Sequence, residues 1–240
     1  MRKLLTCLLL TLAAPPGSGS FAMDFPAEFA VTYHLYSKGA RIASMERAIA
    51  RSEDGSYVYR SDTRTVGLMA LFRKDHVVER SLWTLVDDAL RPLQYTYQRT
   101  GGKRDRNVSV KFDWDAQRII NTINGDSWRM PTEPNVMDKL LYQLAVMHDL
   151  KSGRTPLTYT VADGGKVKIY DFERMGEEMV NTPLGDMLTL KISRHKQQSD
   201  QKMTLWCAPN LNFLPVKVEN VEPDGTTTVA IIQSLSGMPN

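Results

Sequence analysis

One stretch of the chain brings together three residue types that could do acid-base chemistry. Asp75, His76 and Ser81 lie within the run RKDHVVERS, and an acid, an imidazole and a hydroxyl are the parts of a catalytic triad. A serine nucleophile normally sits on a sharp turn such as G-x-S-x-G, and that motif does not occur in the sequence. Ser81 falls in an alternating pattern instead, which predicts a polar strand face with cross-strand ion pairs. We therefore predict no catalytic residue and no enzymatic activity.

The histidines do not follow a metal-binding pattern. His34, His76, His148 and His195 are scattered along the chain, without the paired spacing of a zinc motif and without a cysteine close by. We expect no metal site and no cofactor. His148 stands near the C-terminal end of a predicted helix, which favours a solvated or capping role.

A lone cysteine, Cys207, occupies the stretch TLWCAPNLNFLPVKVENVEPDG. It could be a nucleophile, half of a disulfide or a packing element. Once the leader containing Cys7 is removed, no partner remains for an internal disulfide. Met203, Leu205 and Cys207 share one face at the two-residue period of a strand, and Trp206 points to the other face. This pattern predicts a buried, inert thiol.

The first 22 residues have the layout of a secretory signal peptide. Arg2 and Lys3 precede a short apolar core, and small residues lead up to Ala22. The core is shorter than the roughly 20 residues needed to span a bilayer. We predict cleavage after Ala22 and a periplasmic mature protein with no transmembrane segment. Lipid attachment at Cys7 is the alternative, but that cysteine precedes most of the apolar core instead of following it.

The charge of the mature chain is close to neutral. Loss of Arg2 and Lys3 reduces the 30 basic residues to 28, against 27 acidic ones. This balance gives no reason to expect a nucleic-acid partner, although the basic and aromatic stretch from Tyr95 to Arg106 has suitable residue types. That stretch predicts a hairpin with a charged, solvated tip, and contact with an anionic envelope glycolipid is the alternative. Residues 23–240 suit one domain.

Alternation of apolar and polar residues dominates the mature chain and predicts antiparallel strands. It is cleanest at Phe29–Tyr36, Val108–Trp114 and Leu188–Ser193. Less regular runs occur at Ile42–Arg51, Tyr57–Val66, His76–Val86, Leu93–Arg99, Arg118–Ile123, Leu157–Val161, Val167–Arg174, Lys202–Cys207, Leu214–Val221 and Thr226–Ser234. Turn residues such as Asn124-Gly125 and Asp224-Gly225 separate several of these runs. The pattern predicts a long meander of about a dozen strands, a sheet wide enough that it must curl.

One helix interrupts the predicted meander. Asn135 is a good N-cap, and an apolar stripe follows it at helical spacing, formed by Val136, Leu140, Leu144 and Met147. We predict that this stripe packs against the concave side of the sheet. A shorter helical turn is predicted over Gly67–Phe72, between two strands.

The order of several short motifs along the chain resembles a known family. The motifs are Tyr33 and Gly39, Gly67-Leu68, Leu90-Arg91-Pro92, Phe112-Asp113-Trp114, Trp206, Leu214-Pro215-Val216 and Asp224-Gly225. They are similar to those of the exported bacterial proteins grouped as domain of unknown function 3108, over the whole mature chain. The resemblance carries over no catalytic residue. It implies a mainly β fold, a curved antiparallel sheet forming a half-barrel or open barrel, similar to periplasmic lipoprotein carriers.

Two function classes follow from such a fold. A curled sheet with a helix at its mouth can enclose an apolar ligand, or it can fill its interior with side chains. The first case predicts an envelope protein that binds or carries a lipid or acyl chain, lined by Val136, Leu140, Leu144 and Met147. The second predicts a structural or interaction protein of the cell envelope with a protein partner. A continuous cavity favours the first and an exposed apolar edge the second. We favour the carrier.

Overall fold

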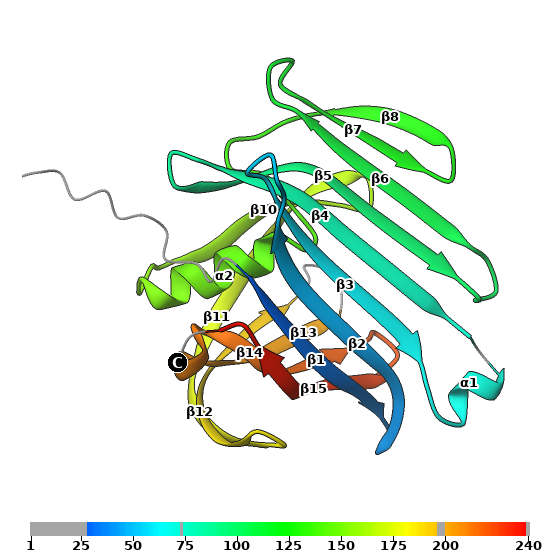
Figure 1. Ribbon diagram of the computed structural model, residues 1–240, viewed down its shortest axis with the longest axis vertical. Coiled ribbons are helices and arrows are strands. Elements are labelled where there is room, and N and C mark those ends of the chain that lie inside the picture. Colours follow the sequence, from blue (N-terminus) through cyan, green and yellow to red (C-terminus); the bar gives the residue numbers. More distant parts are fainter. Residues whose placement is uncertain (1–27, 73, 196–199, 239–240) are drawn as a thin grey trace, which may run out of the picture.

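The computed structural model describes residues 28–72, 74–195 and 200–238 (Figure 1). The predicted signal peptide, residues 1–22, and its cleavage site lie outside this part of the chain. The helical elements are α1 (Met69–Phe72), α2 (Tyr142–Lys151) and the single 3-10 turn η1 (Pro209–Leu211). The strands are β1 (Phe29–Ser37), β2 (Ala40–Arg51), β3 (Tyr57–Thr65), β4 (His76–Val86), β5 (Ala89–Thr100), β6 (Arg106–Asp113), β7 (Arg118–Ile123), β8 (Asp126–Pro131), β9 (Met137–Asp138), β10 (Leu157–Asp163), β11 (Lys166–Thr182), β12 (Gly185–His195), β13 (Lys202–Ala208), β14 (Leu214–Val221) and β15 (Thr227–Ser236).

The strands form one 15-stranded sheet in the order β8-β7-β6-β5-β4-β3-β2-β1-β15-β14-β13-β12-β11-β10-β9. Sequence neighbours pair as antiparallel hairpins, and β1 also pairs with β15, so the two ends of the meander meet in the middle of the sheet. β8 and β9 are consecutive in the chain but lie at opposite edges. β9 pairs in parallel with β10. The sheet is strongly curved and open (Figure 1), as the alternating pattern predicted.

The concave face of the sheet holds the apolar half of the alternation. In β1, Phe29, Val31 and Tyr33 are buried, with exposed fractions of 3% or less. Helix α2 lies against this face: its first residue, Tyr142, packs edge-on against Tyr170 of β11, at a ring-centroid distance of 5.2 Å. The Gln143 side chain of the same helix accepts a hydrogen bond from Arg47 of β2. The helix therefore sits inside the curve, in contact with both arms of the sheet.

The main helix begins later than the sequence predicted. Asn135 is not its N-cap, because its backbone is left-handed with φ of 57°, and the helix starts at Tyr142. The intervening segment forms β9, whose pairing with β10 competes with helix formation. Oδ1 of Asp138 then accepts hydrogen bonds from the backbone N–H groups of Leu140 and Leu141, each at 2.8 Å. A tertiary strand pairing and one buried carboxylate thus replace the first two predicted turns.

Three strands match their predicted bounds, although their alternation is less regular than in the cleanest runs, and strand segments without an apolar face were missed. β4, β7 and β14 begin and end at the predicted residues. β8 was not predicted, because nearly all of its residues are exposed and no apolar face marks it. The second half of β11, up to Thr182, was missed for the same reason. Within the described residues, no helix has the length and apolarity needed to cross a membrane.

Cys207 is a buried free thiol in β13. Its side chain has no exposed area, and burial raises the pKa of the thiol above its ordinary value. Trp206 points to the convex face, where Lys217 Nζ lies 4.0 Å from the ring centroid and Lys191 Nζ lies 5.0 Å from it. The predicted packing role of Cys207 is consistent with this burial.

Candidate functional site

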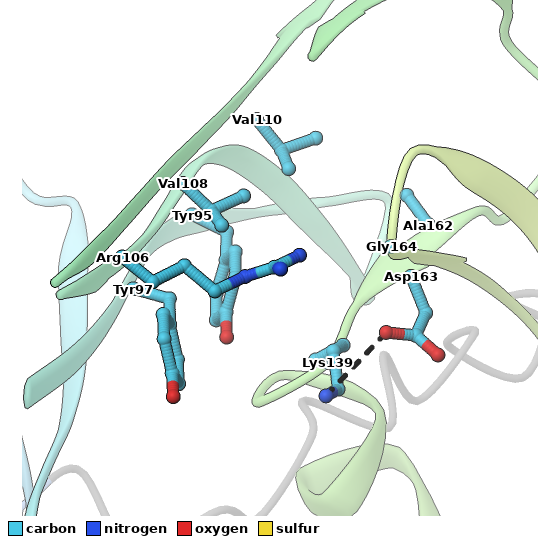
Figure 2. Close-up of a pocket in the computed structure, with 9 residues that line it drawn as sticks. All are labelled: Tyr95, Tyr97, Arg106, Val108, Val110, Lys139, Ala162, Asp163 and Gly164. Atoms are coloured by element: carbon cyan, nitrogen blue, oxygen red, sulfur yellow. Dashed lines mark ion pairs between the residues drawn. The ribbon is translucent and has the colours of Figure 1, made fainter. Parts of the chain in front are cut away.

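A cleft of about 220 Å³ opens on the concave face between β5 and β6 on one side and the β10–β11 turn on the other (Figure 2). We call it the β5–β6 cleft. One wall is formed by Tyr95, Tyr97, Arg106, Val108 and Val110, and the other by Lys139, Ala162, Asp163 and Gly164. The two walls come from segments far apart in sequence, which the curl of the sheet brings face to face.

Strand register places the first wall on one face. In the β5–β6 pair, Tyr95 is opposite Val110 and Tyr97 is opposite Val108. Because side chains alternate along a strand, these four residues and Arg106 all project toward the concave side. Val110 is buried and Val108 is half-buried, so the wall between the aromatic rings is apolar.

One tyrosine of this wall is hydrogen-bonded to a glutamate of the neighbouring strand. The Tyr95 hydroxyl donates a hydrogen bond of 2.6 Å to Oε1 of Glu79, a residue of β4. Burial and then the Glu79 charge raise the pKa of Tyr95 well above its ordinary value, so the phenol stays protonated. Glu79, which does not itself line the cleft, is therefore already engaged by a side chain of this wall.

The opposite wall carries a carboxylate whose hydrogen-bond and ion-pair partners are side chains of the protein itself. Asp163 accepts a hydrogen bond of 3.0 Å from the Tyr170 hydroxyl and pairs with Lys168 at 2.6 Å and Lys139 at 3.4 Å. Burial works to raise the pKa of Asp163, but Lys139 and Lys168 outweigh it and hold the pKa below its ordinary value. Asp163 is thus ionised at neutral pH, with two cations beside it.

Arg106 differs from the other charged groups of the cleft. Figure 2 shows its side chain reaching from β6 into the cleft, where the drawn ion pair joins Lys139 and Asp163 but not Arg106. Among the described residues, no carboxylate lies within ion-pair distance of its guanidinium and no hydrogen-bond acceptor contacts it. The cleft therefore presents a cation whose charge the surrounding chain does not neutralise.

A single tryptophan bridges the gap beside the cleft. Trp128 of β8 donates a hydrogen bond of 3.1 Å from Nε1 to the carbonyl oxygen of Gly165. Its ring occupies the space that a side chain at Gly165 would need, since a Cβ there would lie 2.0 Å from the ring. This contact ties the otherwise exposed edge strand β8 to the β10–β11 turn.

The sequence profile of a protein family of unknown function, DUF3108, matches residues 28–232. The chain belongs to this family. A search of curated proteins finds no significant match. The family assignment confirms the resemblance seen in the sequence, and it brings no assigned activity with it.

Comparison with solved structures supports the fold. A β-barrel-like protein of domain of unknown function DUF1849 from Brucella abortus aligns with a TM-score of 0.57 and 8% identity, covering 89% of this chain and 98% of that chain. A structure from Parabacteroides distasonis, provisionally assigned as a lipoprotein, aligns over 90% of this chain and 98% of that chain at 10% identity, with a TM-score of 0.34. The first similarity establishes the fold alone, and the second score is too low to establish even that.

The four residues predicted to line a ligand cavity lie in a filled core. Val136, Leu140 and Leu144 have no exposed area and Met147 is 2% exposed. Only Leu144 and Met147 belong to α2, because the helix starts after the other two. None of the four lines the β5–β6 cleft. Their contact with a ligand stays a prediction. The β5–β6 cleft is the stronger candidate for a ligand site.

The cleft residues could have been found by a closer look at the alternation. Tyr95, Tyr97, Arg106, Val108 and Val110 all belong to the two strands flanking a predicted hairpin, and they fall on one face at the two-residue period. The stretch from Tyr95 to Arg106 was predicted to be a hairpin with a charged, solvated tip, and the structure has a hairpin there. Only the residues between the strands form that tip, and Arg106 is the first residue of β6.

The structure does not bring the triad candidates together. Nε2 of His76 contacts Oδ1 of Asp62 at 2.8 Å. Ser81 is buried and donates a 2.6 Å hydrogen bond to Asp138. In β4 these two residues are five positions apart, so they project to opposite faces of the sheet. No group of metal-ligating side chains occurs in the described parts of the chain.

A second cleft, of about 420 Å³, lies beside the C-terminal half of α2. Its buried carboxylate is Asp149, which contacts the Tyr159 hydroxyl at 3.1 Å, His148 Nδ1 at 3.3 Å and Arg154 at 3.5 Å. His148 therefore helps to surround a buried carboxylate at the end of the helix. Because these polar groups are directed at one another, this cleft is a weaker candidate for ligand binding than the β5–β6 cleft.

Proposed function

We propose that this protein is exported to the periplasm and binds an apolar or amphipathic small molecule in the β5–β6 cleft. The observation that carries the proposal is the contrast within the concave face. Side chains fill the interior around α2, whereas the β5–β6 cleft stays open between Val108, Val110 and Ala162. Ligand sites are concave and mostly apolar, with a few directed polar groups, and this cleft has that composition.

Export is supported by the sequence of the first 22 residues. We expect the exported protein to start at Met23. N-terminal sequencing of protein recovered from the periplasmic fraction tests this expectation. A chain that still begins at residue 1, or a lipid on Cys7, would contradict it.

Binding is tested by native mass spectrometry of the protein purified from its own periplasm. We expect a reproducible additional mass that is lost when the cleft is filled by Val108→Trp. The matched control is Lys111→Trp, which places the same side chain on the exposed convex face of the same strand. If both variants keep the additional mass, the ligand lies elsewhere. If the wild-type protein carries none and takes up no amphiphile in titration, the proposal fails.

A second candidate function, docking of another envelope protein, is favoured by a different surface. β10 pairs with β11 only as far as Phe172, so the edge of β11 from Glu173 to Thr182 has no partner strand on that side among the described residues. Met175 and Met179 on this segment are 52% and 59% exposed. An unpaired edge beside apolar side chains can accept an added strand.

This second function predicts that a partner is lost when the exposed apolar surface beside the unpaired edge is made charged. Site-specific crosslinking from position 179 in intact cells should capture one defined protein, and Leu188→Lys should abolish that product. Leu188 lies opposite Met179 in the hairpin and is 49% exposed. The control is Ile169→Lys, which alters an equally exposed side chain in the part of β11 that β10 already pairs. Equal yields from all three proteins would exclude docking at this edge.

A further inference from the structure

We infer that the ligand of the β5–β6 cleft carries an anionic group, a carboxylate or a phosphate, that Arg106 binds. The inference rests on the proposed function and adds the chemical class of the ligand to it. It starts from the position of one side chain. Arg106 opens β6 on the concave face and its guanidinium points into the cleft (Figure 2).

The charges around Arg106 favour an anion. On the opposite wall Asp163 pairs with two lysines, Lys139 and Lys168, of which Lys139 also lines the cleft. Glu79 of β4, which does not line the cleft, accepts a hydrogen bond from the Tyr95 hydroxyl. Arg106 adds a further positive charge, and the described residues offer it no ion-pair partner. The charged side chains that line the cleft are Arg106, Lys139 and Asp163, so the lining carries two positive charges and one negative charge.

The cross-strand neighbour of Arg106 strengthens this conclusion. Arg106 lies directly opposite Arg99 in the β5–β6 register. Like charges in such positions destabilise a sheet, and an anion bound beside them relieves the repulsion. Arg99 itself is turned toward the hairpin tip, where it donates a hydrogen bond of 3.2 Å to the Arg104 carbonyl oxygen. Arg106 is thus the member of the pair whose guanidinium remains available to bind a ligand.

The donor groups match a carboxylate or a phosphate. A planar guanidinium binds either group through two parallel hydrogen bonds. The Tyr97 side chain also lines the cleft, and its hydroxyl is a further donor, since no hydrogen bond engages it within the described chain. Beyond these polar groups, Val108, Val110 and Ala162 provide an apolar surface for the rest of the molecule.

The size of the cleft limits how much of the ligand it encloses. Its volume of about 220 Å³ is below the roughly 300–1,000 Å³ of sites that bury a drug-sized molecule. A long-chain ligand would place its head group and the first part of its chain in the cleft and leave the remainder outside. The geometry therefore fits an anionic amphiphile, which could be a free fatty acid or a phosphate-bearing lipid.

Calorimetric titration of the delipidated, exported protein with three matched ligands tests the inference. Decanoate, decyl phosphate and decanol share one chain length and differ in the head group, and each is used below the concentration at which it aggregates. A hydrogen bond to a charged group contributes enough for about a tenfold or larger gain in affinity. We expect at least one of the two anions to bind about tenfold or more tightly than decanol. Whichever anion binds more tightly identifies carboxylate or phosphate as the head group.

Two variants assign the effect to the proposed residue. Arg106→Gln should reduce the affinity for the preferred anion to that for decanol and leave decanol binding unchanged. Arg104→Gln, which removes a guanidinium from the exposed hairpin tip of the same pair of strands, should leave every affinity unchanged. Both changes are at exposed positions, so both variants should fold.

The outcomes separate failure of this inference from failure of the proposed function. Equal affinities for all three ligands, unaltered in Arg106→Gln, would overturn the anionic head group and leave ligand binding intact. Inorganic phosphate binding as tightly as decyl phosphate would overturn the amphiphile and leave only an anion site. If none of the ligands binds to the wild-type protein, the proposed function itself is wrong.

Discussion

The two halves of the concave face are made of the same alternating strands but differ in what covers them. Around α2, Leu140 and Leu144 are fully buried, and the Tyr142 ring packs against Tyr159 and Phe172. In the described part of the chain, the residues that line the cleft opposite Tyr97 and Val108 are Lys139 and the β10–β11 segment from Ala162 to Gly164, and none of them belongs to a helix. An amphipathic helix can fill a concave sheet, and a turn cannot. The difference shows that the cleft results from the position of α2 on the sheet.

The largest expected effect is the loss of packing in the filled half. Leu144→Ala should lower the free energy of unfolding by about 2–5 kcal/mol, because it removes buried methyl groups and leaves a cavity. Leu188→Ala, in a side chain that is 49% exposed, should change it by less than about 0.5 kcal/mol. Chemical denaturation of both variants measures the contrast. Similar losses in the two variants would show that α2 does not pack as described.

We expect the stability of the protein to depend on pH through Asp138, which lies between the filled half and the open half. Burial raises the pKa of this carboxyl to about 6, even though Ser81 and two backbone amides hydrogen-bond to it. The folded state then binds the proton more tightly than the unfolded chain, whose aspartate pKa is about 3.9. The contribution of Asp138 to stability is therefore present below about pH 4 and is lost as the pH rises through about 6, a change on the order of 3 kcal/mol.

Comparison with Asp138→Asn isolates this titration from that of the other carboxylates. The stability difference between the wild type and the variant, measured by urea denaturation, should shift in favour of the wild type as the pH falls from 7 to 4. A difference that does not vary with pH would mean that the pKa of Asp138 is the same in both states. A change of opposite sign would show that its hydrogen bonds outweigh burial.

A smaller effect on stability is expected at Gly165, where the Trp128 ring contacts the β10–β11 turn beside the cleft. Gly165→Ala should lower stability by about 1–3 kcal/mol, since the new Cβ would lie 2.0 Å from the Trp128 ring and force it to move. Gly164→Ala is the matched control: it also has a positive φ, but the nearest atom to its Cβ is Lys168 Nζ at 3.6 Å. The extra loss in Gly165→Ala, together with a changed Trp128 fluorescence, measures the contact. Identical losses would mean that only the backbone conformation matters.

The smallest change in stability is expected at the buried thiol. Cys207→Ser should cost about 1 kcal/mol, because it places a hydroxyl in an apolar site. The sharper measurement is the rate of thiol modification. Cys207 should react only when the protein unfolds, whereas Val108→Cys in the Cys207→Ser background should react rapidly, because it opens into the cleft. Fast labelling of Cys207 in the folded protein would remove the distinction between a filled and an open half.

The candidate site was predictable in part. One wall of the cleft follows from local pattern, since Tyr95, Tyr97, Val108 and Val110 alternate on two strands joined by a Gly-Gly turn. The other wall does not, because Lys139 and Asp163 meet that wall only through the curl of the sheet. The stripe that the sequence did suggest as a lining is so apolar that it packs into the core.

Most strands and turns of this protein were determined by the sequence itself. Alternation at a period of two, interrupted by turn residues such as Asp224-Gly225, specified β14 and placed its hairpin partner β15 next to it. Burial of Cys207 could also be deduced from its place on an apolar strand face. These features depend on contacts between residues close in the chain, where side-chain direction follows directly from position.

The start of the helix, the two free edges and the cleft were decided only by the tertiary structure. The segment from Pro134 to Leu141 has helical spacing, yet β9 forms within it because β10, about 20 residues later, offers a strand to pair with. β8 and β9 lie at opposite edges although they follow one another in the chain. Such outcomes depend on the free energy of long-range pairing and burial, which no local pattern of residues contains.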